Sequence, residues 1–199
     1  MIRFFEICFS IIFLIIFAPV YVIIGFLIFF YDGTPIIFMQ NRVGKNGNEI
    51  KVLKFRSMVK NAELVLKEDK KLYEKYVKNG FKIPSNEDPR IMPFGNFLRR
   101  SSLDEIPQFF NVLKGNMSIV GPRPVVKKEL TDLYKNDAHY YLSVKPGITG
   151  LWQVSGRSNI VGKERVKLDI KTIKNKSLFF DIQIILKTIF TVLKRSGAW

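Results

Sequence analysis

Two neighbouring carboxylates and an arginine between two prolines are the residues of this chain best suited to chemistry. Residues 102–117 read SLDEIPQFFNVLKGNM and contain Asp104 and Glu105, and residues 121–124 read GPRP and contain Arg123. A carboxylate can attack phosphorus or hold Mg²⁺, and an arginine binds phosphate oxygens through two parallel hydrogen bonds. The prolines limit the backbone around Arg123 and so set the direction of its side chain. The pattern indicates transfer of a phosphoryl group.

Both motifs also have simpler structural explanations. The Asp-Glu block matches a capping box, in which Ser102 caps a helix and Glu105 bonds back to it. Pro107 argues against a helix start at Ser102, because the proline would then lose a helical hydrogen bond; a start nearer Asp104 places it in the first turn. On the functional interpretation, the positive end of this helix keeps Asp104 ionised. A tight turn is the competing explanation for residues 121–124.

The order of motifs along the chain resembles that of the bacterial sugar transferases, the monotopic polyprenyl-phosphate phosphoglycosyl transferases. The shared pieces are an apolar N-terminal hairpin, residues 54–58 (KFRSM), the Asp-Glu block, GPRP, and residues 146–157 (PGITGLWQVSGR). The resemblance covers almost the whole chain and is closest to the branch that uses UDP-galactose or UDP-glucose. It implies transfer of a sugar 1-phosphate from the UDP-sugar to undecaprenyl phosphate, with release of UMP, at the start of polysaccharide or glycoconjugate synthesis.

The resemblance also implies roles for individual residues. Asp104 is the nucleophile that forms a covalent phosphosugar-aspartyl intermediate, and Glu105 binds Mg²⁺, the expected cofactor. The expected substrate-binding residues are Lys54, Arg56, Arg99, Arg123, Pro124 and Arg157. Arg99 and Arg123 are the first choices for a phosphate clamp, because an arginine keeps its proton and offers paired donors to the charge that develops during transfer.

Residues 7–30 contain no charged side chain and form a candidate membrane anchor. A straight helix of this length would exceed the ~30 Å hydrocarbon core of a bilayer, so a single spanning helix is one interpretation. Pro19 interrupts it, and basic residues lie at both ends, which places both ends on the cytoplasmic side. We therefore favour a re-entrant helix-break-helix over residues 1–33, as in the family. Members commonly have Ser-Pro at the break, where this chain has Ala18 before its proline.

The expected fold is α+β and mostly helical. A compact catalytic domain over residues 34–199 would follow the anchor, on the cytoplasmic face of the bacterial inner membrane. Residues 35–40 and 49–55 flank a glycine-bearing turn and predict a short β-hairpin. Residues 59–77 predict one surface helix. Residues 178–195 predict an amphipathic helix in the membrane interface, with a core-facing helix as the alternative.

Composition limits the partners. The single cysteine, Cys8, excludes a disulfide framework and a thiolate zinc site. A net charge of +15 indicates anionic partners. We expect a UDP-sugar, undecaprenyl phosphate and the phospholipid membrane, and no nucleic acid; no oligomeric state is predicted.

Two alternatives stay open. One is the same chemistry with a UDP-acetamido-sugar as the donor. The other is a non-enzymatic, membrane-tethered protein that binds nucleic acid or acidic lipid, which leaves Asp104 and Glu105 unexplained.

Overall fold

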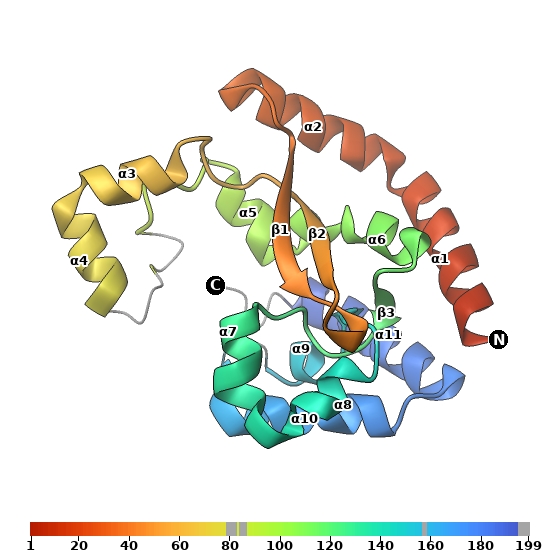
Figure 1. The fold of residues 1–199 in the computed structure, drawn as a ribbon. Helices are drawn as coiled ribbons and strands as arrows, with labels where there is room; N and C mark the ends of the chain where they lie inside the picture. The colour runs from red at the N-terminus through yellow and green to blue at the C-terminus, as the bar shows by residue number, and fades with distance from the viewer. Residues whose placement is uncertain (79–82, 84–86, 157–158, 195–199) are drawn as a thin grey trace.

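Helices make up most of the fold, and the strands are short. The computed structural model describes residues 1–78, 83, 87–156 and 159–194, and within these ranges the strands form two two-stranded sheets (Figure 1). The first half of the chain contains α1 (Ile2–Ile16), α2 (Ala18–Asp32), β1 (Ile37–Val43), β2 (Glu49–Phe55), α3 (Ala62–Glu68), α4 (Lys70–Lys78) and α5 (Gly95–Arg100). The second half contains α6 (Gln108–Lys114), β3 (Ser118–Val120), α7 (Lys127–Glu129), α8 (Ala138–Leu142), β4 (Gly147–Thr149), α9 (Leu151–Ser155), α10 (Gly162–Lys174) and α11 (Leu178–Leu193). The mostly helical α+β prediction is confirmed, whereas the second sheet was not foreseen.

The N-terminal apolar segment folds into two helices that meet at a break. α1 ends at Ile16, α2 begins at Ala18, and the two are bent by 60°. Pro19 lies in the first turn of α2, where a proline removes no helical hydrogen bond. The predicted break is confirmed. Among the described residues no single helix is long and apolar enough to cross a membrane; only this bent pair has the combined length and composition.

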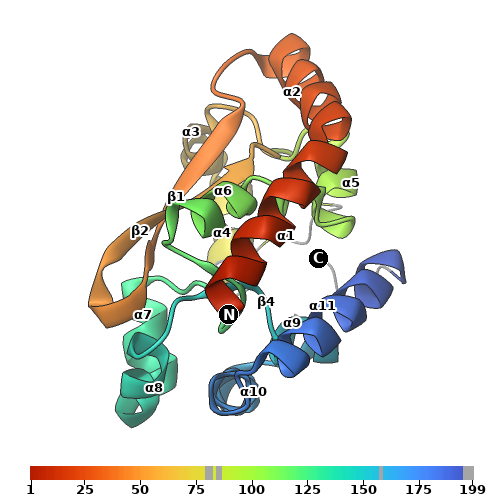
Figure 2. The ribbon, with the colours of Figure 1, turned by 90° about the vertical axis from the view of Figure 1, so that its right-hand side faces the viewer.

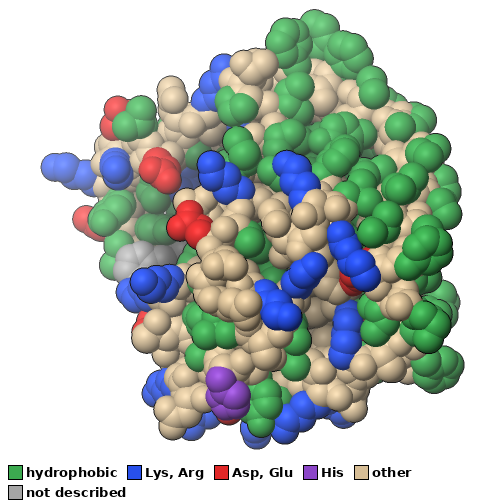
Figure 3. All heavy atoms as spheres, turned by 45° about the vertical axis from the view of Figure 1, so that its right-hand side comes forward, with side chains coloured by type: hydrophobic (Ala, Val, Ile, Leu, Met, Phe, Trp, Pro, Cys, Tyr) green, Lys and Arg blue, Asp and Glu red, His purple; other side chains and the backbone are tan. Residues whose placement is uncertain are grey.

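One face of the helix pair packs against the rest of the protein. The ring of Phe13 stacks on Phe109 of α6 with centroids 4.1 Å apart, and Ile24 and Ile28 are buried beside Phe55 of β2. The opposite face is exposed and apolar, with Phe4, Ile11, Ile12, Ile15, Ile16, Val22, Ile23, Phe26, Leu27, Phe29 and Phe30. Apolar side chains cover the upper and right-hand edges of the surface in Figure 3. Such a large apolar face marks a contact with a membrane or another protein.

A β-hairpin follows the N-terminal helix pair, as predicted. β1 and β2 pair antiparallel, with Gln40 opposite Val52. Alternate residues of a strand share a face, so Gln40 and Arg42 lie on the same face as Val52 and Lys54. The hairpin thereby presents two basic side chains on one side.

Asn111 of α6 attaches this hairpin to the helix that follows the Asp-Glu block. Its side chain is buried; its Oδ1 accepts a hydrogen bond from the Leu53 N–H at 3.0 Å, and its amide donates to the Lys51 carbonyl at 2.7 Å. These bonds satisfy backbone groups on the edge of β2 that β1 does not cover. They hold Lys54, on the same strand, next to the Asp-Glu turn.

Three glycines allow the second sheet to form. β3 and β4 run parallel, and the Gly121 N–H donates to the Thr149 carbonyl at 2.8 Å. A Cβ on Gly147 would overlap the backbone nitrogen of Gly121, and a Cβ on Gly150 would overlap the Gly121 carbonyl oxygen. Glycine at these positions lets the segment that contains β4 lie directly against the start of GPRP.

The predicted single helix of residues 59–77 is wrong, because the chain forms α3 and α4 there. Between them Asp69 has an extended backbone, with φ −89° and ψ 96°. Its carboxylate accepts a hydrogen bond from the Leu72 N–H at 3.0 Å and so caps α4. The helical spacing of apolar residues continues across such a break, so this spacing alone did not reveal it.

The predicted C-terminal helix is confirmed as α11. Ile184 and Ile185 are buried in a cluster that Phe5 and Phe9 of α1 also contact. On the other side of α11, the exposed side chains are Phe179, Ile182, Leu186, Ile189, Phe190 and Leu193. Figure 2 shows α11 on the same side of the molecule as the N-terminal helix pair. Its location in a membrane interface stays a prediction.

Candidate active site

Asp104 and Glu105 lie on one short 3-10 turn, Leu103–Glu105, between α5 and α6. The turn follows Ser102, whose φ of 58° is in the left-handed region, and α6 begins only after Pro107. Because the Ser102 side chain makes no capping hydrogen bond, the capping-box alternative is wrong. The two carboxylates belong to a turn of their own.

Burial is the largest influence on the pKa of Asp104. Its side chain is 8% exposed, and burial raises the pKa of this carboxyl from 3.8 to about 6. The positive charge of Lys54 opposes that rise, and the carboxylate of Glu105 adds to it. Arg99 and Arg123 also oppose the rise. These three basic side chains therefore favour the ionised form of Asp104, and the expected contribution of a helix terminus stays a prediction.

Glu105 lines a narrow cavity of about 10 Å³ between the hairpin and GPRP. The Nζ of Lys54 lies 2.7 Å from Glu105 Oε1, and the Nη1 of Arg123 lies 3.9 Å from the same oxygen. The other lining residues are Gln40, Arg42, Val52, Gln108, Pro124 and Ile148. A cavity of this size holds about one water molecule. A phosphate group therefore enters only when the ion pairs across the cavity separate.

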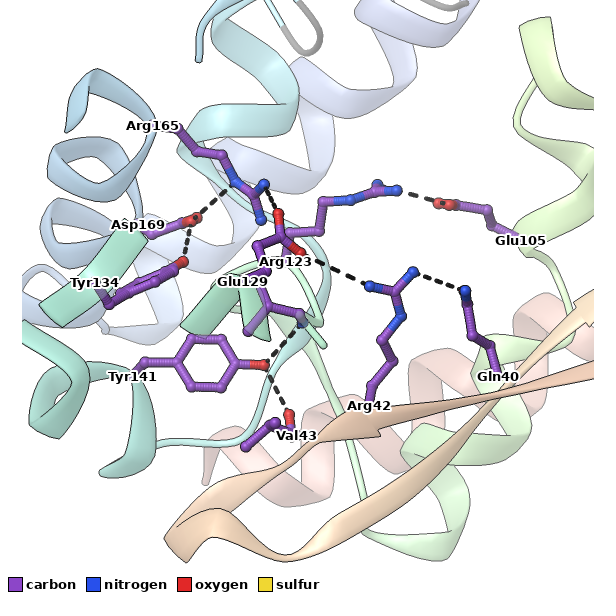
Figure 4. Close-up of polar contacts among 11 residues, drawn as sticks. Gln40, Arg42, Val43, Glu105, Arg123, Glu129, Tyr134, Tyr141, Arg165 and Asp169 are labelled. Carbon is purple, nitrogen blue, oxygen red and sulfur yellow. Dashed lines mark hydrogen bonds and ion pairs between the residues drawn. The ribbon is translucent and has the colours of Figure 1, made fainter. Parts of the chain in front are cut away.

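A buried network holds Arg123 in place (Figure 4). Fully buried Asp169 accepts hydrogen bonds from the Tyr134 hydroxyl, at 2.6 Å, and from the backbone of Arg123. The guanidinium of Arg123 lies 5.4 Å from the ring centre of Trp152, and that of Arg165 lies 4.6 Å from it. Both distances are within cation–π range. The backbone bond and the ring contact together orient Arg123.

Arg42 extends this network to the hairpin. Its Nη2 donates to Gln40 Oε1 at 2.7 Å, and its Nη1 lies 3.8 Å from a carboxylate oxygen of Glu129, which also pairs with Arg165 (Figure 4). Burial and the charge of Arg123 lower the pKa of Arg42. The guanidinium therefore stands in a site already rich in positive charge, as expected where a polyanion binds.

The predicted arginine of α5 lies next to the nucleophile candidate. The charge of Arg99 acts on Asp104, and its Nε donates to Ser57 Oγ at 2.8 Å. Burial lowers the pKa of Arg99. Arg99 is not a lining residue of the cavity, whereas Lys54 and Arg123 are.

Arg56 is directed away from the cavity. Its guanidinium pairs with the Asp32 carboxylate and donates to the Gly33 carbonyl at 2.6 Å, so it ties the end of α2 to β2. The structure thus gives Arg56 a structural contact that the motif did not reveal. Arg157 lies outside the described residues.

Sequence reasoning missed four residues of the site. Gln40 and Arg42 could have been predicted, because the alternation of side chains along the two strands places both on the same face of the hairpin as Lys54. Asp169 and Asn111 could not have been predicted, because each contacts residues that are far away in the sequence and no motif links them.

The donor set of the turn fits Mg²⁺. This ion takes one or two carboxylates and fills its other positions with water and phosphate oxygens. Glu105 lines the cavity, and Asp104 is its neighbour on the turn. Within the described ranges, no group of three or more His, Cys, Asp or Glu side chains could enclose a metal ion. A metal here would therefore need phosphate oxygens from a substrate to complete its shell.

The chain belongs to the bacterial sugar transferase family, whose model matches residues 1–195. It is 46% identical, over 99% of its length, to the undecaprenyl-phosphate galactose phosphotransferase of Salmonella typhimurium. It is 47% identical, over 91% of its length, to the UDP-galactose-lipid carrier transferase of Erwinia amylovora. The chain spans only 41% and 38% of these two relatives. The exopolysaccharide production protein ExoY of Sinorhizobium fredii is 41% identical, with 99% of this chain and 87% of the relative covered. The resemblance drawn from the motifs is confirmed.

We expect Asp169→Asn to weaken the binding of uridine diphosphate about 10-fold, or ~1.4 kcal/mol. The neutral amide loses the charge that strengthens the hydrogen bond from the Arg123 backbone, so Arg123 is held less firmly. Isothermal titration calorimetry of the full chain in detergent measures the change. Asp132→Asn, at an exposed position, is the matched control and should bind as the wild type does. Wild-type affinity in Asp169→Asn, with an unchanged unfolding temperature, would contradict the positioning role.

Proposed function

We propose that this chain transfers a hexose 1-phosphate from a UDP-sugar to undecaprenyl phosphate, releases UMP, and thereby initiates synthesis of a polysaccharide or glycoconjugate. The observation that carries the proposal is the Asp104–Glu105 turn. Glu105 pairs with Lys54 and Arg123 at the cavity, and the charges of the same two basic side chains act on the neighbouring Asp104. The names of the Salmonella and Erwinia relatives support UDP-galactose as the first donor to test. UDP-glucose is the next choice, and a UDP-acetamido-sugar is the alternative.

The first step forms a bond between the protein and the sugar phosphate. A carboxylate oxygen of Asp104 attacks the β-phosphorus of the UDP-sugar, and the bond from that phosphorus to the bridging oxygen breaks as UMP leaves. Lys54 and Arg123 exchange their contacts with Glu105 for contacts with phosphate oxygens, where their charge stabilises the transition state. Mg²⁺, held by Glu105, would supply further neutralisation of the diphosphate.

The second step returns Asp104 to its starting state. An oxygen of undecaprenyl phosphate attacks the same phosphorus, and the Asp104 carboxylate leaves with the electrons of the broken bond. The product is an undecaprenyl diphosphate sugar. The burial of Asp104 supports this sequence, because it limits access of water to the acyl phosphate.

We also infer that α1 and α2 form a re-entrant anchor and that α11 lies in the interface of the inner membrane, with the catalytic domain on its cytoplasmic face. The 60° bend and the continuous apolar outer face support this topology. The packing of Phe13 on Phe109 keeps the anchor against α6. An anchor in this position would bring the phosphate of a lipid acceptor to the height of the catalytic turn.

Turnover by the purified full chain tests the proposed reaction. With Mg²⁺ and undecaprenyl phosphate, the wild type should release UMP from one member of a UDP-sugar panel. Asp104→Asn should lower the rate at least ~10³-fold, because it removes the nucleophile. Asp132→Asn should keep the wild-type rate. Without acceptor, the wild type should release about one equivalent of UMP and gain the mass of one sugar phosphate.

Two results would contradict these proposals in different ways. If UMP release requires the acceptor and the protein mass stays unchanged, the covalent intermediate is contradicted, whereas the overall transfer reaction is supported. No release from any UDP-sugar, together with salt-sensitive binding of nucleic acid, would favour the binding-protein alternative.

The rate should depend on pH through the ionisation of Asp104. Asp104 attacks only when ionised, and its pKa is raised to about 6. The ionised form of Asp104 therefore predominates above pH 6 and is lost as the pH falls through this value. As a result, kcat/KM should fall about tenfold per pH unit below pH 6. Arg99→Gln should move this acid limb to higher pH, because the guanidinium lowers the pKa of Asp104. Arg100→Gln, at an exposed position, should leave the limb in place. An acid limb near pH 4 would contradict the assignment.

Labelling of single cysteines tests the topology of the helix pair. In a Cys8→Ser background, a cysteine added at the N-terminus and one at Thr34 should react with a membrane-impermeant maleimide from the same side. Lys163→Cys, on the exposed face of α10, marks the side of the catalytic domain. Labelling of the N-terminal cysteine from the opposite side to Thr34→Cys would establish a spanning helix instead.

A further inference from the structure

A second, larger cavity adjoins GPRP. It has a volume of about 340 Å³ and lies among the first turn of α1, β3, the loop after α8 and the end of α10. Gly121 and Pro122 line it, whereas Arg123 and Pro124 line the active-site cavity, and the two cavities share no lining residue. The larger cavity is therefore a separate site on the same rigid segment.

Four basic side chains line this cavity, namely Arg3, Lys45, Lys145 and Lys176. The Nη2 of Arg3 and the Nζ of Lys145 lie 3.6 Å and 3.7 Å from the position that a Cβ on Gly115 would take, so the two cationic groups converge. Burial and the charge of Arg3 lower the pKa of Lys145. An anion bound here would relieve the repulsion among these cations.

The carboxylate that lines the cavity is already bonded. Glu6 is buried; it accepts hydrogen bonds from the Ser118 hydroxyl and from the Ile119 N–H, the latter at 3.1 Å. Its other oxygen lies 3.7 Å from a guanidinium nitrogen of Arg3. Glu6 therefore offsets one positive charge and fixes the wall of the cavity.

Positive charge remains in excess. Lys176 pairs with Asp181 at 2.7 Å and donates to the Val120 carbonyl at 2.6 Å. Over the part of the chain that the structure describes, neither Lys45 nor Lys145 takes part in an ion pair. The four cations thus meet two carboxylates, Glu6 in the cavity wall and Asp181, which pairs with Lys176. An excess of positive charge of this kind is typical of an anion site.

The cavity lies at the end of an apolar helix. Ile2 of α1 lines it, and Met1 and Phe4, on either side of Arg3, are 101% and 75% exposed. Figure 3 shows basic side chains gathered next to the apolar surface. Cations bordered by exposed apolar groups suit a phosphate that is attached to an acyl or prenyl chain, because the chain can remain in the membrane.

We propose that the cavity between α1, β3 and α10 binds the phosphate group of a membrane lipid, at a site separate from the Asp-Glu turn. Lys45 and Lys145 supply the main charge, and Arg3 the donors from the anchor. A lipid phosphate held there couples the first turn of α1 to the GPRP wall. The proposal stands without the proposed reaction, because it concerns binding and uses residues outside the catalytic cavity.

The test is lipid binding to the full chain in detergent, measured by native mass spectrometry. Phosphatidylglycerol is the first probe; undecaprenyl phosphate and inorganic phosphate are separate arms. The double variant Lys45→Gln with Lys145→Gln should bind phosphatidylglycerol about 10-fold more weakly than the wild type does. Lys163→Gln with Lys167→Gln removes the same charge from exposed positions of α10 and should leave binding unchanged. Arg123→Gln, in the catalytic cavity, should also leave it unchanged.

A second variant separates charge from shape. Ser143→Tyr places a ring in the cavity and keeps all four cations, and it should weaken lipid binding to a similar extent. Tighter binding of undecaprenyl phosphate than of phosphatidylglycerol at this site would support the proposal and name the lipid. Unchanged affinity in both the double variant and Ser143→Tyr would overturn it. Equal affinity for inorganic phosphate would overturn its lipid part and leave a site for free phosphate.

Discussion

The close backbone contact between Gly121 and two other glycines is the constraint on which both cavities depend. Gly147 and Gly150 approach Gly121 so closely that none of the three positions has room for a Cβ. The Gly147 N–H also donates to the Pro122 carbonyl at 2.8 Å. These contacts make GPRP a rigid wall, with Arg123 on the catalytic side. A side chain at these glycines would part β3 from β4 and displace the wall of both cavities.

Basic side chains line a cavity on each side of this wall. On the catalytic side, burial of Asp104 disfavours its ionised form, and three basic side chains restore it. This balance suits a carboxylate that must be both shielded from water and ionised. On the other side, Lys45 and Lys145 form no ion pair with any residue that the structure describes, and Glu6 is the one carboxylate among the residues that line their cavity. Each of the two cavities thus holds a local excess of positive charge within a chain whose net charge is +15.

Local signals made much of the fold predictable. The break near Pro19 follows from the missing N–H of proline, and the β-hairpin follows from alternation on both sides of a glycine turn. The Asp-Glu block and GPRP combine residue types that few structural roles require together. The errors arose where a local pattern has two solutions: Asp69 ends one helix and caps the next, and Ser102 adopts a left-handed conformation in place of a cap.

The sequence by itself determined the family, the position of the break between the two apolar N-terminal helices and the chemical types of the candidate site residues, because these depend on neighbouring residues and on periodicity. Only the tertiary structure decided which basic side chains reach the carboxylates. Arg56 binds the end of α2, although its motif suggested a phosphate contact. Asp169 supports Arg123, and Asn111 places Lys54, through contacts between segments far apart in the chain. Such contacts depend on how the elements pack, and no local pattern encodes that packing.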